Sequence, residues 1–491
     1  MTSPSAADDA DRSPATLFVK CWLEAEQERA SDRAIALQPG EDFRVAGVRI
    51  AEQGNPQIAY DGLEALIDRA RSRSQRLGNL LATMAAIDHV FLRIHPRAAI
   101  VPPGRVARPP IPYWLRDLRD RRAIEGAYLE SSSRLLVPRG PLLRTARNAE
   151  ASCADSLADR FAALCLAPAQ IDFDGQAVPI RVLNFGSDVI DGVSPVPLPG
   201  RERIAFVPLA EDDTDLEVSR IDHGGRPFIR FAPTAALDVV QRMIDAVGIT
   251  GQVEMAIAPE LVTTPDGIET LSHQLRTLAA APNITLAGTA NTTEQRSNQP
   301  FNEAVILNST GSVLFRQRKL WPASFSADDA CKIGLVSDTH TERLPENNAS
   351  GAELFVADFD GFGRVIVLIC QDFTHEFAEH IINFYQPDWV LVPILDHGFA
   401  GHRWAHKRAF ALSQNAQSRF VAVTSSSLAH LLSKPLPAAI GMAVGPATSE
   451  EASDTDRASI LLTADPARSP AVAMTQWRGP GWSQVTVELY K

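Results

Sequence analysis

Three residues whose side chains could act together in covalent catalysis each follow a short strand-like run. Cys370 follows the apolar stretch Val365–Ile369, Glu260 comes directly after a proline at the end of another apolar stretch, and Lys319 lies just past a third segment. A thiol is a nucleophile, a carboxylate can take its proton, and an ammonium can stabilise an oxyanion. This set could cleave a carbonyl carbon–nitrogen bond through a covalent intermediate.

Cys370 is expected at an elbow between a strand and a helix. The run Val365–Ile369 is short enough for a fully buried strand, and the residues after Cys370 can open a helix. The backbone N–H groups after such an elbow are unpaired, so we expect them to lower the pKa of the thiol and to receive an oxyanion. The alternative is a buried cysteine that ends a core strand. Glu260 and Lys319 favour the first interpretation.

The order Glu, Lys, Cys, each at the mouth of a strand, resembles the nitrilase or carbon–nitrogen hydrolase superfamily. The resemblance covers about residues 203–491. The matched phrases are Pro259-Glu260, Gly311–Lys319 with its Arg318-Lys319 pair, Phe362-Gly-Arg364, Ile369-Cys370-Gln371-Asp372, Asn302 within Phe301–Asn308, Arg408-Ala409 and Gln414-Asn415. No one phrase is specific, but the ordered set is.

The resemblance implies a role for each matched residue. Glu260 would be the general base, Lys319 the cation for the oxyanion, and Cys370 the nucleophile, with the backbone N–H of Gln371 as a second oxyanion donor. The family also carries a second glutamate between the lysine and the cysteine. Five acidic residues lie in that interval and none stands in a matched phrase: Asp328, Asp329, Glu342, Glu346 and Glu353. The substrate-binding residues are therefore not assigned.

The pair Gln371-Asp372 after the cysteine resembles the amidase branches, because the true nitrilases usually have Trp-Glu there. The expected reaction is hydrolysis of a linear amide, with a nitrile as the weaker alternative, through a thioester. The partners would be a small-molecule amide or nitrile and water, without a cofactor. The rival hypothesis is a non-catalytic ligand-sensing or regulatory protein that uses the same fold; an intact Glu, Lys, Cys set favours the enzyme.

The composition is that of a soluble globular protein. The 491 residues are 45% hydrophobic and 22% charged, with a net charge of −12, which argues against nucleic acid as a partner. The five cysteines are odd in number and widely spaced, which indicates free thiols in a reducing compartment. No apolar run reaches ~18 residues and the polar start lacks a signal core, so we expect a cytoplasmic protein away from membranes.

Four regions are expected along the chain. Residues 1–15 predict a disordered tail, 16–166 a mainly helical domain of unknown role that includes a helix over Ala149–Leu166, 167–202 linking strands and a turn, and 203–491 the hydrolase domain. Strands alternate with helices in the last region, which indicates an α/β class. The resemblance sharpens this to an α-β-β-α sandwich and implies a homo-oligomer.

Arginines crowd two stretches of the N-terminal region. They are Arg69, Arg71, Arg73 and Arg76, then Arg105, Arg108, Arg116, Arg119, Arg121 and Arg122. One interpretation is a patch for an anionic partner. The other is a solvated helix face, because acidic residues are interleaved at helical spacing.

Histidines gather after the cysteine and suggest a second kind of site. Asp396-His397, His402 and His406 lie close in sequence, with His375 and His380 upstream. His402 and His406 are four apart on an expected helix and would share a face, as metal ligands do. Helical histidine pairs are more often surface or pocket residues, so we predict no metal site.

Overall fold

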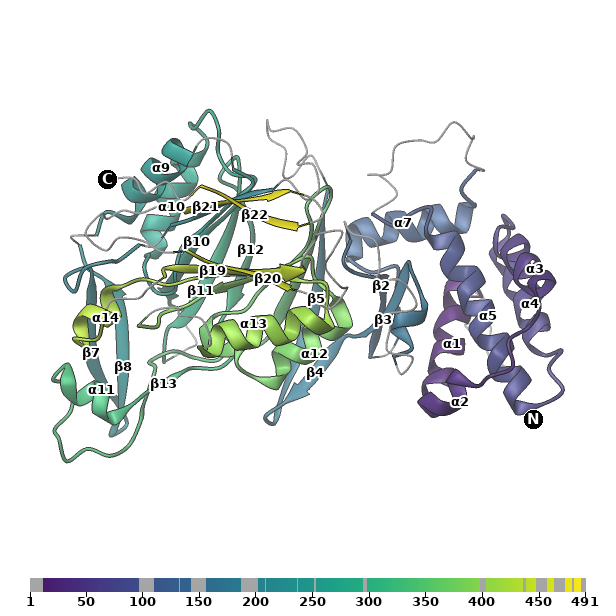
Figure 1. Ribbon diagram of the computed structural model, residues 1–491, viewed down its shortest axis with the longest axis horizontal. Helices are drawn as coiled ribbons and strands as arrows, with labels where there is room; N and C mark the ends of the chain where they lie inside the picture. Colours follow the sequence, from purple (N-terminus) through teal and green to yellow (C-terminus); the bar gives the residue numbers. More distant parts are fainter. Residues whose placement is uncertain are drawn as a thin grey trace. The chain divides into compact units, whose positions relative to one another are not determined.

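A computed structural model divides the chain into two compact units, which are described separately (Figure 1). Unit 1 comprises Met1–Gln170, Val182–Asn184 and Phe384–Gln386, and unit 2 comprises Ile171–Arg181, Phe185–Asn383 and Pro387–Lys491. The structure describes residues 12–96, 110–131, 133–142, 156–186, 202–207, 209–235, 237–250, 253–294, 298–397, 403–435, 439–446, 457–462, 473–478 and 481–486.

Unit 1 is built mainly from α-helices. They are α1 (Pro14–Glu26), α2 (Ala30–Ala34), α3 (Glu41–Ala51), α4 (Pro56–Ile67), α5 (Arg73–Phe91) and α7 (Tyr113–Glu125). Helix α1 begins with a capping box between Ser13 and Thr16 and has a proline in its first turn. The helix therefore starts inside the range expected as a tail, of which residues 1–11 lie outside the described part of the chain.

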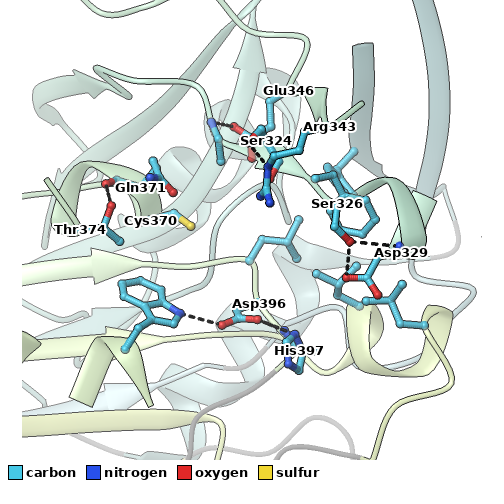
Figure 2. A pocket seen from close by; sticks show the side chains of 17 residues that line it. Ser324, Ser326, Asp329, Arg343, Glu346, Cys370, Gln371, Thr374, Asp396 and His397 are labelled. Carbon is cyan, nitrogen blue, oxygen red and sulfur yellow. Dashed lines mark hydrogen bonds and ion pairs between the residues drawn. The ribbon is translucent and has the colours of Figure 1, made fainter. Parts of the chain in front are cut away.

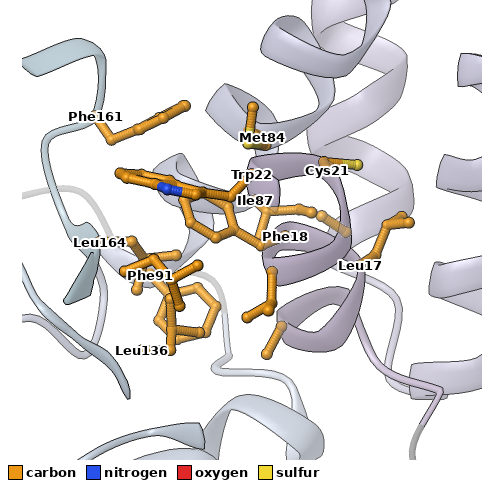
Figure 3. Close-up of a cluster of buried hydrophobic side chains, with 14 of the residues drawn as sticks. Leu17, Phe18, Cys21, Trp22, Met84, Ile87, Phe91, Leu136, Phe161 and Leu164 are labelled. Carbon is orange, nitrogen blue, oxygen red and sulfur yellow. The ribbon is translucent and has the colours of Figure 1, made fainter. Parts of the chain in front are cut away.

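Helix α5 is the packing centre of unit 1, because α1, α3 and α4 all pack against it. Its apolar residues join an aromatic cluster in which the Phe161 ring lies 5.2 Å from Phe18 and 5.6 Å from Trp22, centroid to centroid (Figure 3). Such offset and edge-on ring pairs add stability beyond their buried area. These helices thus have a hydrophobic core of their own.

The expected helix over Ala149–Leu166 is wrong for the part of it that the structure describes. A short 3-10 turn, Ala158–Arg160, is followed by strand β3 (Leu164–Pro168), which pairs antiparallel with β2 (Arg134–Pro138) beside β1 (Leu129–Ser131). The buried Asp88 carboxylate accepts the N–H groups of Ala162, Ala163 and Leu164 at 2.8–2.9 Å. Strand pairing and this side-chain cap satisfy the backbone and override the helical propensity of the local sequence.

Four of the described arginines of the crowded stretches are paired with acidic side chains. The pairs are Arg73 with Glu28 (2.6 Å), Arg76 with Glu24 (2.7 Å), Arg119 with Asp120 (3.1 Å) and Arg121 with Glu125 (3.8 Å). This favours the interpretation as a solvated helix face. Arg105 and Arg108 lie outside the described residues.

Unit 2 contains two large β-sheets. One has seven strands in the order β12 (Val313–Arg318), β11 (Phe301–Asn308), β10 (Ile284–Thr292), β9 (Met255–Ile257), β6 (Arg203–Phe206), β21 (Ala473–Arg478) and β22 (Gly481–Thr486). The other has eight in the order β20 (Arg457–Leu462), β19 (Gly441–Pro446), β18 (Arg419–Val423), β17 (Trp389–Pro393), β16 (Gly363–Val367), β15 (Leu354–Phe359), β5 (Gln176–Phe185) and β4 (Gln170–Phe173).

The centre of each sheet is parallel. Strands β6, β9 and β10 run parallel in one sheet, and β16, β17 and β18 in the other. Helices α9 (Val239–Thr250) and α10 (Pro265–Leu275) contact the seven-stranded sheet, and α13 (Trp404–Asn415) contacts the eight-stranded sheet. The carboxyl ends of such parallel strands are where α/β proteins place ligands and catalytic groups.

The strands β4 and β5 form one edge of the eight-stranded sheet. They fall in the range 167–202, which was expected to be a link between two parts. The residues of these strands pair into the eight-stranded sheet. The prolines of the expected turn, Pro195–Gly200, lie outside the described residues.

Strands β11 and β12 form a hairpin of antiparallel neighbours. Its turn contains Gly311 at φ 72°, where a Cβ atom would come within 1.9 Å of the Ser272 backbone oxygen. Only glycine fits this turn without a shift of the backbone. The turn sends β12 back towards the position where Lys319 follows it.

Candidate active site

The structure brings Glu260, Lys319 and Cys370 together from the ends of three strands. Glu260 follows β9 and Lys319 follows β12 in the seven-stranded sheet, whereas Cys370 follows β16 in the eight-stranded sheet. Glu260 and Lys319 are fully buried, and Cys370 is half-buried on the wall of a cavity. Strand ends from both sheets thus meet at one place.

Cys370 occupies an elbow with unusual backbone geometry. Its φ is +46°, and it opens the 3-10 turn Cys370–Phe373, which leads to helix α12 (Glu376–Tyr385). A non-glycine residue in the left-handed region costs of order 1–3 kcal/mol and persists only where the surroundings enforce it. The strand-to-helix elbow that the sequence predicts is therefore present, with local strain at the sulfur-bearing residue.

Lys319 lies between two carboxylates. Its Nζ is 2.8 Å from Oε1 of Glu260 and 2.6 Å from Oε2 of Glu346. Burial alone would lower the pKa of Lys319, but the charges of both carboxylates outweigh it and hold that pKa well above its ordinary value. The ammonium is therefore a fixed positive charge in a water-poor site.

Glu346 is the acidic residue that the sequence left undecided among five. It follows the short strand β14 (Leu344–Pro345), lines the cavity and pairs with Lys319. Its carboxylate also accepts the Ala323 N–H at 3.1 Å. The segment that carries it lies between the lysine and the cysteine in sequence but contains no distinguishing phrase, so only the three-dimensional arrangement selects it.

Glu260 is held by donors on three sides. Oε1 accepts Asn302 Nδ2 at 2.8 Å in addition to Lys319, and Oε2 accepts the Leu395 N–H at 2.9 Å. The Cys370 thiol lies close enough to this carboxylate to lower its pKa. Burial raises the pKa of Glu260; Lys319 opposes this, and the charge of Glu346 adds to it. The result is a fixed carboxylate that is more basic than an ordinary one and is in contact with the thiol.

The expectation that the elbow lowers the pKa of the Cys370 thiol is wrong. Burial raises that pKa well above its ordinary value, and the charges of Glu260 and Glu346 raise it further against the opposing effect of Lys319. The Leu395 N–H favours the thiolate, but not enough to reverse the direction. The resting side chain is therefore a neutral thiol.

Asp372, two residues after the cysteine, connects the two catalytic strand ends. Its buried carboxylate accepts the N–H groups of Leu320 and Trp321 at 3.0 Å each, and that of Ile369 at 3.3 Å. Burial raises its pKa to about 7, although these backbone donors oppose the shift. One side chain thus fixes the segment after Lys319 against the segment that carries Cys370.

The cavity beside Cys370 has a volume of about 440 Å³ (Figure 2). Apolar and polar groups share its walls: Phe231, Ala323, Ser324, Phe325, Ser326, Asp329, Arg343, Glu346, Cys370, Gln371, Thr374, Leu395, Asp396, His397, Trp404, Leu428 and Leu432. This volume is in the range of small-molecule sites. Gln371, the expected backbone donor for an oxyanion, lines the same cavity as the thiol.

The histidines do not form a metal site within the part of the chain that the structure describes. No group of three or more His, Cys, Asp or Glu residues there has a geometry suited to a metal ion. His397 instead pairs with Asp396, with Nδ1 2.7 Å from Oδ1. His402 lies outside the described residues.

None of the described helices combines the length and the apolar character that crossing a bilayer requires.

Comparison with known proteins gives matches to solved structures alone. No family model matches the sequence, and no curated protein gives a significant match. Nit3 of Saccharomyces cerevisiae, a member of branch 10 of the nitrilase superfamily, is 13% identical over 57% of this chain and 91% of that chain, with a TM-score of 0.38. The C. elegans NitFhit protein is 16% identical over 54% of this chain and 61% of that chain, with a TM-score of 0.36. An amidase from Nesterenkonia sp. AN1 is 13% identical over 56% and 94%, with a TM-score of 0.33.

Proposed function

We propose that this protein is a cysteine-dependent hydrolase of non-peptide carbon–nitrogen bonds and that it cleaves a linear amide through a thioester. One observation carries the proposal: the Cys370 thiol, half-buried on the cavity wall, lies beside a buried carboxylate, Glu260, that is 2.8 Å from the buried ammonium of Lys319. A nucleophile, its base and a cation for the developing oxyanion are the parts that acyl transfer requires.

Acylation begins with transfer of the thiol proton to Glu260 as the sulfur attacks the amide carbon. The raised pKa of Glu260 suits this, because a general base works best when its pKa lies near the operating pH. The negative charge that develops on the carbonyl oxygen would be stabilised by the Lys319 ammonium and the Gln371 N–H. The protonated Glu260 then gives its proton to the nitrogen, so that ammonia or an amine leaves and a thioester remains.

Deacylation uses the same groups in the reverse order. Glu260 takes a proton from a water molecule as its oxygen attacks the thioester carbon, and Lys319 again stabilises the oxyanion. Collapse of the tetrahedral intermediate breaks the carbon–sulfur bond, the sulfur recovers a proton from Glu260, and a carboxylic acid is released. Glu346 takes no part in proton transfer; it helps to hold Lys319 charged.

The architecture proposed with this function is an α-β-β-α sandwich in unit 2, of the carbon–nitrogen hydrolase type. Gly441 of β19 supports face-to-face packing of the two sheets, because a Cβ atom there would lie 2.7 Å from the Phe206 ring of β6. Contacts of β12 with β15 and of β19 with β22 also cross between the sheets. A homo-oligomer belongs to the same proposal and is tested by sedimentation.

The test is an intact-mass experiment with a panel of linear amides. Wild-type protein should gain the mass of the acyl group after rapid acid quenching. C370S lacks the thiol, so it should show no thioester adduct. The matched control is C331S, which removes another cysteine of unit 2 that is neither beside Glu260 nor on the cavity wall. An adduct retained in C370S, or lost in C331S, would contradict the assignment; ligand binding without any acyl transfer would support the rival sensing hypothesis.

A further inference from the structure

The charges around the cavity point to a feature of the substrate beyond its amide group. Four lining side chains carry formal charges: Asp329, Arg343, Glu346 and Asp396. Each of the three carboxylates lies beside a cation, and Glu346 shares its cation, Lys319, with Glu260. The pairs are Asp329 with Lys434 at 3.1 Å, Glu346 with Lys319 at 2.6 Å and Asp396 with Arg403 at 3.1 Å. Each acidic side chain of the cavity wall is therefore already paired with a cation of the protein.

Arg343 is different from the other three. Its Nε donates to the Ser324 hydroxyl at 2.7 Å, and its Nη2 donates to the Ser324 carbonyl oxygen. Both acceptors are neutral, and no carboxylate among the described residues forms an ion pair with this guanidinium. Arg343 is exposed and lies with Cys370 on the walls of one cavity (Figure 2). A positive charge without a counter-charge thus faces the space beside the nucleophile.

His397 does not alter this balance of charge. Its Nδ1 lies 2.7 Å from Asp396 Oδ1, and the other carboxylate oxygen of Asp396 accepts Trp404 Nε1 at 2.9 Å. Burial lowers the pKa of His397 against the attraction of Asp396, so the ring is neutral at physiological pH. When the Nδ1–H group donates to Asp396, the neutral ring can offer Nε2 as a hydrogen-bond acceptor.

We propose that the substrate is an amide that also carries a carboxylate, which Arg343 binds at the mouth of the cavity while the amide carbon lies at Cys370. The proposal rests on the hydrolase function proposed above. The fork of a guanidinium matches a carboxylate in geometry, and Ser324 holds this guanidinium in place before the ligand arrives. A cavity of about 440 Å³ accommodates both ends of a small molecule.

The first experiment compares pairs of amides that differ only in the acidic end. Glutaric acid monoamide carries a carboxylate on the acyl side, and pentanamide lacks it. N-Acetyl-β-alanine carries a carboxylate on the amine side, and N-propylacetamide lacks it. Wild-type protein should prefer the acidic member of one pair in kcat/KM. R343Q should raise KM for that member by roughly 10- to 150-fold, the range of a hydrogen bond to a charged group. The neutral member should change by less than about twofold.

The matched control is R181Q, which removes another exposed arginine of unit 2 whose partner, Glu353, lies outside the cavity lining. It should leave both members of each pair unchanged. If wild-type protein prefers the neutral members, or if R343Q slows both members alike, the inference is overturned while the hydrolase function stands.

A binding measurement separates this inference from the hydrolase function. C370A cannot form a thioester, so calorimetric titration with the same four amides measures recognition alone. An acidic amide should bind C370A more tightly than its neutral counterpart, and R343Q/C370A should lose that preference while R181Q/C370A keeps it. This result supports the inference even if wild-type protein hydrolyses none of the four. Equal binding of acidic and neutral amides to C370A overturns it.

Discussion

Replacing Lys319 by glutamine should leave two buried carboxylates facing each other without a cation. Glu260 and Lys319 are fully buried and the Glu346 side chain is 12% exposed. Both acidic oxygens lie within hydrogen-bond distance of one nitrogen, so they are no more than about 5.4 Å apart, where charges at low dielectric repel strongly. Removing one partner of a buried ion pair costs about 3–5 kcal/mol of unfolding free energy, and we expect K319Q to fall in that range.

The matched variants are E346Q and K319Q/E346Q. E346Q keeps the Lys319–Glu260 pair and should cost about 1–2 kcal/mol for the lost charged hydrogen bond. The double variant removes the cation together with one of the two carboxylates, so it should be more stable than K319Q by about 1–2 kcal/mol. The effects of neighbouring residues in one ion-pair network are not additive, and the double-mutant cycle of K319Q, E346Q and K319Q/E346Q measures that coupling.

The effect of pH on K319Q has a definite sign. Burial raises the folded-state pKa of Glu260 above that of the unfolded chain against the charge of Lys319, so that pKa rises further without the ammonium. A carboxyl with a raised folded pKa contributes stability below its unfolded pKa and loses it as the pH rises through the folded pKa. The stability deficit of K319Q relative to wild type should therefore grow from about pH 5 to about pH 8.

Hydrogen exchange is the suitable assay, because the chain has two compact units and its global unfolding need not be a single transition. Exchange of the backbone amides of β12 and of the segment after it reports on unit 2 alone. Additive costs for K319Q and E346Q in the double variant, or a K319Q deficit that shrinks as the pH rises, would refute the assignment of Lys319 as the cation shared by two ionised carboxylates.

Three further results are expected. In E260Q, amide acylation should fall by about 10²- to 10⁴-fold because the base that takes the thiol proton is lost; an acylation rate equal to that of the wild-type protein would contradict the proton-acceptor role. In D372N, the stability difference from wild type should shift in favour of the variant from about pH 5 to about pH 8, because a carboxyl with its pKa raised to about 7 loses its stabilising contribution as the pH rises through that value; a pH-independent difference in urea titrations would contradict this. G311A should lower the free energy of unfolding by about 2–4 kcal/mol, because its new Cβ would meet a backbone oxygen at 1.9 Å. G225A, at a comparable φ of 81° but in open space, should lower it by only about 1 kcal/mol. Equal shifts of the two variants in thermal unfolding would refute the steric account.

The sequence was informative where chemistry and local pattern coincide. Cys370 could be placed on an elbow because an apolar run of strand length precedes it. The α/β class followed from the alternation of strands and helices. These features depend on residues close together in the chain.

Features that depend on distant contacts could not be read from the pattern. Glu346 differs from the other acidic residues of its interval only by lying next to Lys319 in space. The raised thiol pKa of Cys370 depends on burial and on carboxylates brought from other segments. Strand β3 forms because β2 and the Asp88 carboxylate satisfy its backbone, and neither contact is visible in the local sequence.

The Asp372 carboxylate has a consequence for how the protein acquires activity during folding. It accepts N–H groups from the segment after β12 of one sheet while it lies on the turn after β16 of the other. A folding intermediate with only the eight-stranded sheet formed would have the thiol without Glu260 or Lys319, and one with only the seven-stranded sheet would have the base and the cation without the thiol. On the proposed mechanism, a newly synthesised chain would carry out no acyl transfer until both sheets have docked, so the onset of acyl transfer would report the time of docking.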